Sequence, residues 1–592
     1  MAQNQWLFDN GWQFSRDGKT VTVDLPHDWD IYVAPDPTSG ATGTGGGWYP
    51  GGQGEYRKRF KTPDAEIVRL HFEGVYQQAE VFVNGQKTGQ HAYGYTPFTI
   101  DVTPYLYQDK RDNEVVVKVD NSQQPNCRWY SGSGIYRHVW LQTKRKQYID
   151  EQSVYVTTPD IHTVHIQAEV VMTDGSRKPI ERTIHVEQPH LWTPDDPYLY
   201  HTTVEAEGDV VPVTYGIRTI SFDAEKGFLL NGKPLLINGA CVHHDDGVLG
   251  AMAFDAAEIR KVRQMKDAGF NLVRTSHNPT TRAFLDACDS IGMLVIGEAF
   301  DGWRTAKTPH DYSTLIDSCL DYLGESGIGR TYYEGERPGE HYVRGGQPDW
   351  HGAYCGDVDI TGWRKPISHY RELLWKDSPD LYMAVREPDG YRGKIHLTAW
   401  SVWPTWESWN WQGCEGKAID VEVYTKAPEV RLYLNDRLIG TKTVSRATAY
   451  KAVFPVPYEA GTLRAEVSGK SVTLQTAGEP ARLRLAADRS VITGDGQDLA
   501  YITVEVVDSE GRVCPEAAIP CEAIVKGQGQ LLAFASADLT DREAATSASV
   551  KTWKGRALLV VRSSGKRGRV QVTVKSNLPS ASLSLQTFKP TK

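Results

Sequence analysis

The sequence predicts a multidomain chain in which all-β sandwiches, a jelly roll and immunoglobulin-like domains, flank a truncated (β/α)8 TIM-type barrel. The length of 592 residues suggests about four domains at roughly 150 residues each. Both ends of the chain read as short strands separated by turns, whereas the middle alternates strands with helices. A hydrophobic content of 40% and a charged content of 23% are ordinary for a folded chain and exclude extensive disorder.

The composition also narrows the class of ligand. A net charge of −9 and a pI near 6.0 argue against nucleic acid or an anionic membrane, because both partners require a basic face. No run approaches the ~18–20 consecutive apolar residues that a membrane span requires. The 17 Trp and 29 Tyr favour ligands with apolar faces and polar rims, and sugars fit this description. We therefore expect a carbohydrate partner.

Two β domains are expected before the barrel. In residues 1–150, the run VRLHFEGVYQQAEVFVNGQKTGQ alternates apolar and polar positions and turns at Asn84-Gly85, which is typical of a type I′ hairpin. This segment predicts a jelly roll. Residues 151–218 repeat the strand pattern more briefly. They predict a small immunoglobulin-like sandwich, shorter than the ~100 residues usual for that fold.

Residues 219–385 predict the barrel. KPLLINGACVH, NLVRTSH and MLVIGEAF read as strands, and the segments between them read as helices. Three successive strand–helix units imply a parallel sheet with right-handed crossovers. KPISHYRELLW, residues 365–375, predicts a last helix. In the first helix, the apolar residues expected on one face are Ile259, Val262, Met265 and Ala268.

The remainder predicts two further immunoglobulin-like sandwiches, residues 386–476 and 477–592. The eight cysteines include no CxxC pair, so neither a zinc cluster nor a disulfide framework is expected. Cys514 and Cys521 are close enough to bridge across a hairpin, but two free buried thiols are the favoured interpretation. We expect no metal and no cofactor.

Several motifs, in order along the chain, resemble glycoside hydrolase family 2, the group of β-galactosidases, β-glucuronidases and β-mannosidases. WYPGGQGEYRKRF, HFEGVYQQAEVFVNGQKTG and RWYSGSGIYRHVWL resemble its sugar-binding domain. GFLLNGKPLLINGACVHHDD, NLVRTSHNP and GMLVIGEAFDGW resemble the opening of its catalytic barrel. The resemblance implies a retaining exo-β-glycosidase, of β-galactosidase type, acting on terminal β-galactosides. MAQNQWLFDNGWQF shows no signal peptide, and we expect a periplasmic or secreted protein whose leader was removed.

The resemblance places candidate sugar-binding residues at the ends of the three barrel strands, where barrel active sites collect. An alternative for one of them, Glu298, is a structural ion pair with Arg274. A tryptophan cluster at 400, 403, 406, 409 and 411 is interpreted as packing between domains rather than as a sugar-stacking surface. The candidate sugar-binding residues are His243, His277, Glu298, Asp301 and Trp303.

The sequence does not show the two carboxylates that retaining glycosidases place about 5–5.5 Å apart. The family places its acid/base Glu after an Asn at the end of the fourth strand, and its nucleophile at the end of the seventh. The one Asn-Glu pair in the chain is Asn113-Glu114, in a predicted sandwich strand. Residues 304–319 alone separate Trp303 from a motif that the family places near its eighth strand, and one strand–helix unit needs about 30 residues.

We therefore assign no catalytic residue and expect a chain that is weakly active or inactive. The alternatives are a carbohydrate-binding pseudoenzyme and a structural multi-sandwich protein. Glu325 and Glu298 are the best substitutes for the missing pair. An unclosed parallel sheet exposes its edges, so we also expect a homo-oligomer, or a helix over residues 311–324, to cover the open barrel.

Overall fold

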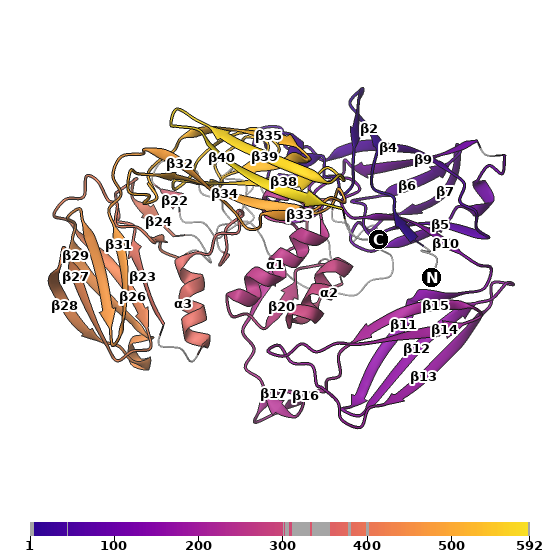
Figure 1. Ribbon diagram of the computed structural model, residues 1–592, viewed down its shortest axis with the longest axis horizontal. Helices are drawn as coiled ribbons and strands as arrows, with labels where there is room; N and C mark the ends of the chain where they lie inside the picture. The colour runs from indigo at the N-terminus through magenta and orange to yellow at the C-terminus, as the bar shows by residue number, and fades with distance from the viewer. Residues whose placement is uncertain are drawn as a thin grey trace.

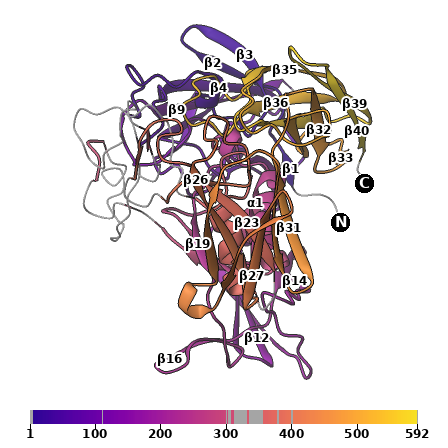
Figure 2. The same cartoon turned by 90° about the vertical axis from the view of Figure 1, so that its left-hand side faces the viewer.

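The computed structural model describes residues 5–43, 45–109, 111–299, 301, 307–310, 332–333 (backbone), 356–376, 380–397 and 402–589. Four β domains surround a small α/β unit (Figure 1). Helices α1 (Asp255–Asp267) and α2 (Arg282–Ile291) lie at the centre, beneath the C-terminal sandwich. In the turned view, β12 (Thr163–Val171) and β16 (Ile220–Asp223) lie at the end of the molecule far from β2 (Trp12–Arg16) and β35 (Pro520–Gly527) (Figure 2). Among the described residues, no helix has the length and apolar character needed to cross a membrane.

The N-terminal domain consists of two antiparallel sheets packed face to face, of six strands (β3-β2-β4-β9-β6-β7) and four strands (β1-β10-β5-β8). Alternating side chains fill the space between them, including Trp12, Tyr56 and Phe72, which are fully buried. The predicted hairpin is confirmed: Asn84 and Gly85 have φ values of 50° and 81°, as a type I′ turn requires. The strands are β1 (Gln5–Leu7), β2 (Trp12–Arg16), β3 (Lys19–Val23), β4 (Gly52–Lys61), β5 (Ile67–Phe72), β6 (Ala79–Val83), β7 (Gln86–His91), β8 (Phe98–Asp101), β9 (Asp112–Asn121) and β10 (Val139–Lys144).

The second domain is a small sandwich with a three-stranded and a two-stranded antiparallel sheet. Val164, Ile166, Val204 and Val213 from both sheets form its core. The core is small because its strands span only seven to thirteen residues and clear alternation of buried side chains is confined to β12 and β15. The strands are β11 (Tyr148–Asp160), β12 (Thr163–Val171), β13 (Arg177–His185), β14 (Tyr200–Ala206) and β15 (Asp209–Tyr215).

The barrel unit contains the three predicted parallel strands, paired in the order β19-β20-β21. Helices α1 and α2 cover one face of this sheet, where Val262 and Phe284 pack against Val273. Thr281 caps α2 by accepting from the amide of Phe284, and Gly292 ends this helix with a left-handed φ of 88°. The elements are β16 (Ile220–Asp223), β17 (Gly227–Leu230), β18 (Lys233–Pro234), β19 (Gly239–Val242), α1 (Asp255–Asp267), β20 (Leu272–Thr275), α2 (Arg282–Ile291), β21 (Leu294–Gly297) and α3 (Pro366–Trp375).

The other face of the three-stranded sheet corresponds to the inside of a closed barrel. Arg274 lies on this face in register with Cys241 and Ile296. Ile296 is 50% exposed and Leu236, just before β19, is 77% exposed. The helix expected over residues 311–324 lies outside the described residues, as does Glu325. The described part of the barrel unit therefore buries one face of its sheet and exposes the other.

The third sandwich joins the sheets β25-β23-β26-β29 and β28-β27-β30-β31. The boundary expected between residues 385 and 386 falls inside β23, which pairs with β26 along Leu381–Val385. Met383 and Val385 pack into the sandwich core, so this strand belongs to the sandwich and not to the barrel. The strands are β23 (Leu381–Arg386), β25 (Thr405–Trp406), β26 (Ala418–Thr425), β27 (Glu429–Leu434), β28 (Arg437–Thr443), β29 (Lys451–Pro457), β30 (Thr462–Val467) and β31 (Lys470–Gln475), with a separate pair β22 (Tyr332–Tyr333) and β24 (Ile395–His396).

The C-terminal sandwich packs against the rest of the molecule through an apolar cluster that includes Tyr501, Val560, Phe254 and Ile31. Through this cluster, the segment that connects β19 to α1 packs against both the jelly roll and the C-terminal sandwich. Cys514 and Cys521 are free and buried, as favoured from the sequence. The strands are β32 (Arg482–Ala487), β33 (Val491–Thr493), β34 (Leu499–Val507), β35 (Pro520–Gly527), β36 (Gly529–Ala535), β37 (Ser549–Lys551), β38 (Arg556–Ser563), β39 (Gly568–Lys575) and β40 (Ala581–Phe588).

The described members of the predicted tryptophan cluster pack between and within these domains. Trp409 and Trp411 are buried in the core of the third sandwich. Trp406 contacts Trp553 of the C-terminal sandwich, edge to face, with ring centroids 5.5 Å apart. Trp403 donates to the carbonyl of Glu387. The packing interpretation therefore agrees with these contacts, and Trp400 lies outside the described residues.

Candidate functional site: a histidine cluster at the strand ends

The candidate residues lie together because the three barrel strands are parallel. His243 follows β19, His277 follows β20, and Glu298 and Asp301 follow β21. The carboxyl ends of parallel strands share one edge of the sheet. The ring centroids of His243 and His277 are 5.3 Å apart. Four of the five predicted residues thus form one cluster, and the fifth, Trp303, lies outside the described residues.

His277 is at the centre of the cluster and is 6% exposed. Its Nδ1 atom lies 3.5 Å from Glu298 Oε2 and 3.6 Å from Asp301 Oδ1. These distances exceed those of good hydrogen bonds, and Nδ1 has no hydrogen-bond partner among the described residues. The ring of Trp129 packs at 4.8 Å, centroid to centroid, against the ring of His277. The imidazole is thus held in place by packing, with its Nδ1 atom buried between two carboxylates and without a hydrogen bond.

The jelly roll supplies residues that sequence reasoning did not assign to the site. Arg128 Nη2 donates to both carboxylate oxygens of Asp301, at 2.8 and 2.7 Å. Trp129 donates through Nε1 to the Tyr95 hydroxyl at 2.9 Å. Both residues belong to the RWYSGSGIYRHVWL motif, which was the signal that could have identified them. This loop therefore closes one side of the histidine cluster.

Both carboxylates of the cluster are bound by cations. Asp301 is 3% exposed and accepts from Arg128, and Lys307 Nζ lies 3.2 Å from Asp301 Oδ1. Glu298 Oε1 accepts from Arg274 Nε at 2.7 Å. The structural alternative weighed for Glu298 is thus an observed contact. The charge-assisted hydrogen bonds therefore hold both carboxylates in fixed orientations.

The histidines of the cluster are neutral. Burial, the largest cause, together with the nearby His243, Arg274 and Arg128, lowers the pKa of His277 to about 3. Burial likewise lowers the pKa of His243, and it lowers that of the adjacent His244 to about 3. A neutral imidazole carries one donor and one acceptor nitrogen. Such a pair can both donate to and accept from sugar hydroxyls.

Several buried polar atoms of the cluster have no hydrogen-bond partner among the described residues: His243 Nδ1, His277 Nδ1, Ser276 Oγ and Asn278 Nδ2. An unpaired buried polar group costs about 1–3 kcal/mol. A ligand that offers hydroxyl groups at this edge would relieve that cost. Among the described residues, this cluster included, no group of three or more His, Cys, Asp and Glu residues has the arrangement of a metal site.

The Asn113-Glu114 pair does not belong to the cluster. Both residues lie in β9 of the jelly roll, and Glu114 accepts from Arg57 at 2.5 Å in the same sheet. Asn113 is buried and accepts from the backbone amide of Tyr107. This pair is therefore part of the framework of the N-terminal domain.

Five family models match successive parts of the chain. The sugar binding domain of glycosyl hydrolases family 2 matches residues 44–145, a general family 2 model matches 99–218, and the family 2 TIM barrel domain matches 223–312. A domain of unknown function matches 416–473, and the glycoside hydrolase family 2 C-terminal domain 5 matches 483–584. The family 2 models together account for the jelly roll, the second domain, the barrel unit and the C-terminal sandwich.

Similar proteins point to the same family as the family models. The chain is 29% identical to the beta-galactosidase BoGH2A of Bacteroides ovatus over 785 residues, covering 96% of this chain and 90% of that protein. It is 24% identical to a beta-glucuronidase of Formosa agariphila over 645 residues, covering 78% and 65%. A crystal structure of a family 2 member from Bacteroides cellulosilyticus superposes with a TM-score of 0.90 at 29% identity, covering 99% of this chain and 100% of that chain. The predicted fold class of sandwiches with a TIM-type barrel unit is confirmed, and the chain belongs to glycoside hydrolase family 2.

Proposed function

We propose that the histidine cluster binds the terminal sugar of a β-galactoside, and that this chain hydrolyses the glycosidic bond weakly or not at all. The observation that carries the proposal is the pairing of two neutral histidines with two carboxylates that are already bound by cations. The histidines and Asn278 offer unpaired hydrogen-bonding atoms. A site of this kind recognises hydroxyl groups, because a ligand lacking them leaves those atoms unsatisfied.

The pairing of the carboxylates argues against their use as a catalytic pair. A retaining enzyme needs one carboxylate free to attack carbon and one carboxylic acid able to give up its proton. Asp301 is held by Arg128 and Glu298 by Arg274, so each carboxylate is already engaged by a cation of the chain. The long alignment with the Bacteroides ovatus relative also supports a missing segment, since 785 residues exceed the 592 of this chain.

Two sugars fit the family. The relative that aligns over most of the chain is a beta-galactosidase, and this favours galactose. A glucuronide is the second candidate, because Arg128, Arg274 and Lys307 gather at the cluster. Each of these cations contacts a carboxylate of the chain itself, so their charge is balanced, and a neutral sugar is favoured over an anionic one.

Binding can be tested directly by calorimetric titration with galactose. We expect saturable binding by the unaltered chain and a loss of about tenfold or more in affinity in His277→Phe, which keeps a ring but removes both nitrogens. The matched control is His165→Phe, an exposed histidine of the second domain, with unchanged affinity. Absence of binding in the unaltered chain would favour a structural multi-sandwich protein, and tighter binding of glucuronate would favour the second sugar.

Two further proposals concern assembly and location. We propose that a second copy of the chain covers the exposed face of the β19-β20-β21 sheet, supported by the exposure of Ile296 and of Leu236 just before β19. We also propose that the protein acts in the periplasm or is secreted. Cell fractionation tests the location: recovery with the periplasm or the medium supports it, and recovery with the cytoplasm alone contradicts it.

A further inference from the structure

A cavity lies where the third sandwich, the C-terminal sandwich and the segment leading into α3 meet, and it contains none of the histidine-cluster residues. Its volume is about 130 Å³, roughly ten times the ~10–15 Å³ that one water requires on the same measure. That space suits a molecule of about a dozen non-hydrogen atoms, which is the size of one hexose.

Four indole rings line this cavity: Trp363 before α3, Trp406 and Trp411 of the third sandwich, and Trp553 of the C-terminal sandwich. The four rings come from three segments that are distant in sequence, so the arrangement of the domains brings them together. Lys554 Nζ lies 4.4 Å from the centroid of Trp406, and Arg556 Cζ lies 3.6 Å from that of Trp363. The cavity thus combines flat apolar rings with polar groups at their faces.

One indole of the cavity has an unused donor. Trp411 is 1% exposed, and its Nε1 has no acceptor among the described residues. By contrast, Trp406 Nε1 donates to Glu387 Oε2 at 2.8 Å, and Trp409 Nε1 donates to the carbonyl of Glu459 at 3.0 Å. A buried unpaired N–H group is costly, and Trp411 is one of the residues that line the cavity.

Three cations that line the cavity pair with carboxylates of the protein. Lys554 is 10% exposed and lies 3.6 Å from Glu516, and burial lowers its pKa to about 8. Arg556 Nε donates to Glu505 at 3.2 Å, and Arg364 pairs with Glu372 at 2.6 Å. A phosphate or carboxylate ligand would have to displace one of these partners. The balance therefore favours an uncharged ligand that is rich in hydroxyl groups.

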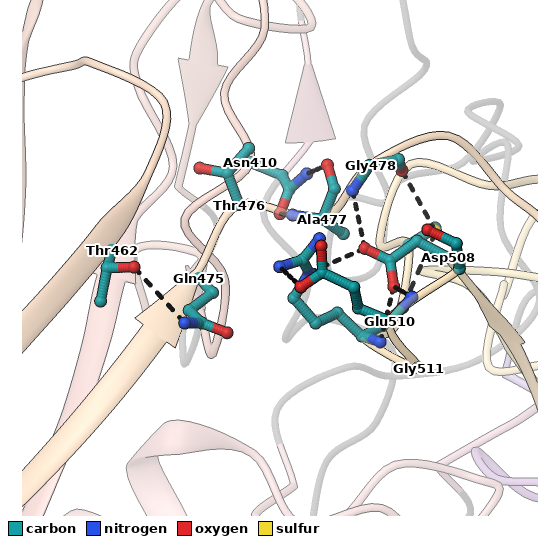
Figure 3. Close-up of polar contacts among 12 residues, drawn as sticks. Asn410, Thr462, Gln475, Thr476, Ala477, Gly478, Asp508, Glu510 and Gly511 are labelled. Carbon is teal, nitrogen blue, oxygen red and sulfur yellow. Dashed lines mark hydrogen bonds and ion pairs between the residues drawn. The ribbon is translucent and has the colours of Figure 1, made fainter. Parts of the chain in front are cut away.

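The junction between the two sandwiches is held by hydrogen bonds, so the cavity walls are fixed relative to each other (Figure 3). Asn410 binds the backbone of Ala477 in both directions, as donor at 3.3 Å and as acceptor at 3.1 Å. The next residue, Gly478, donates to Asp508 at 2.9 Å. Asn410 also lines the cavity. A wall positioned in this way needs no reorganisation to receive a ligand.

We propose that this inter-sandwich cavity is a second carbohydrate site, which holds one neutral hexose unit with its ring against the indoles and a hydroxyl oxygen accepting from Trp411 Nε1. The site is distinct from the histidine cluster, and its occupation does not depend on the function proposed for that cluster. A single hexose in a site of this size binds with a dissociation constant on the order of millimolar.

The test is tryptophan fluorescence or calorimetric titration with galactose, glucose and mannose, on three variants of the full chain. Trp411→Phe removes the unpaired N–H and keeps an aromatic ring. Trp409→Phe is the matched control, because Trp409 lies in the same core but does not line the cavity. His277→Phe removes binding at the histidine cluster. Thermal melts confirm that each variant is folded.

We expect a hexose-binding event that persists in His277→Phe, weakens about three- to tenfold in Trp411→Phe, and is unchanged in Trp409→Phe. Loss of all hexose binding in His277→Phe would overturn the second site while leaving the first intact. Equal weakening in Trp411→Phe and Trp409→Phe would also overturn it, since core damage would then explain the effect. Saturable binding of inorganic phosphate or a nucleotide in place of hexoses would contradict the assigned ligand class.

Discussion

Arg128 of the jelly roll and Asp301, which follows the third barrel strand, form a buried ion pair in which one guanidinium nitrogen donates to both carboxylate oxygens, at 2.8 and 2.7 Å. The side chains are 7% and 3% exposed. This contact joins the N-terminal domain to the barrel unit at the histidine cluster, and it engages one of the two carboxylates near His277.

Replacing Arg128 should destabilise the fold. Arg128→Ala leaves the buried Asp301 without its main partner, and we expect a loss of about 3 kcal/mol in the free energy of unfolding. The measurement is urea denaturation at neutral pH. Arg57→Ala, at a partly exposed pair with Glu114, is the control and should cost about 1 kcal/mol or less. Equal costs in the two variants would contradict the assigned importance of the buried pair.

The neutral state of His277 predicts a dependence of stability on pH. Its pKa is lowered from 6.5 to about 3 on folding, so the unfolded chain binds more protons between these values. The contribution to stability is complete above pH 6.5 and is lost as pH falls toward 3. The free energy of unfolding of the unaltered chain should fall between pH 7 and pH 5, and His277→Gln should make that fall smaller by about 2 kcal/mol.

Urea denaturation at pH 7 and pH 5 measures this difference. His201→Gln, an exposed histidine of β14, should leave the pH dependence as it is in the unaltered chain. If His277→Gln retained the whole of that dependence, the interpretation of a neutral buried histidine would be wrong. Galactose binding should likewise vary little between pH 5 and pH 8.

His138 should show the opposite dependence. Burial alone would lower its pKa, but hydrogen bonds to Asp255 and Asp9 outweigh burial and raise the pKa well above its usual value. A raised pKa contributes stability that is complete below pH 6.5 and is lost as pH rises through the folded-state value. His138→Gln should therefore be most destabilising at pH 6, by about 3 kcal/mol, and less so in alkaline solution.

The comparison for this variant is His190→Gln, which breaks an exposed pair with Asp196 and should cost about 1 kcal/mol or less. Guanidinium denaturation at pH 6 and pH 9 measures both variants. A cost in His138→Gln that grew with rising pH would show that the ring is not held as a cation between the two carboxylates.

If a second copy of the chain covers the exposed face of the β19-β20-β21 sheet, the protein should form an oligomer in solution. We expect light scattering to report an oligomer, and Ile296→Lys to shift it toward the monomer, because a charge would then have to be buried in the contact. Leu438→Lys is the control, since Leu438 is 52% exposed on β28, far along the chain from this face. A monodisperse monomer in the unaltered chain would contradict the proposed assembly.

Much of the fold follows from local patterns. The helix over 255–267 and the strands around Val273 and Val295 were predictable because apolar periodicity and a glycine stop are read within a few residues. The Asn84-Gly85 hairpin was predictable from turn chemistry. The boundary near residue 385 was not, because β23 is distinguished from a barrel strand only by its pairing with β26.

The candidate site was predictable in part, for a similar reason. His243, His277, Glu298 and Asp301 follow their strands directly, so strand order alone brings them to one edge. Arg128 contacts Asp301 from a loop about 170 residues earlier in the chain. This contact forms because the jelly roll packs against the barrel unit, and local sequence patterns do not reveal that packing. The partnership of Trp406 with Trp553 has the same origin, since neither sandwich alone contains the cavity they line.

The central claim is that the histidine cluster binds a galactoside whose bond the chain does not efficiently break. Calorimetric titration with galactose, run beside a chromogenic assay with a nitrophenyl β-galactoside, tests it most directly. The account predicts saturable heat with the unaltered chain, and turnover near background both in the unaltered chain and in Glu298→Gln. Turnover well above background that disappears in Glu298→Gln would contradict it.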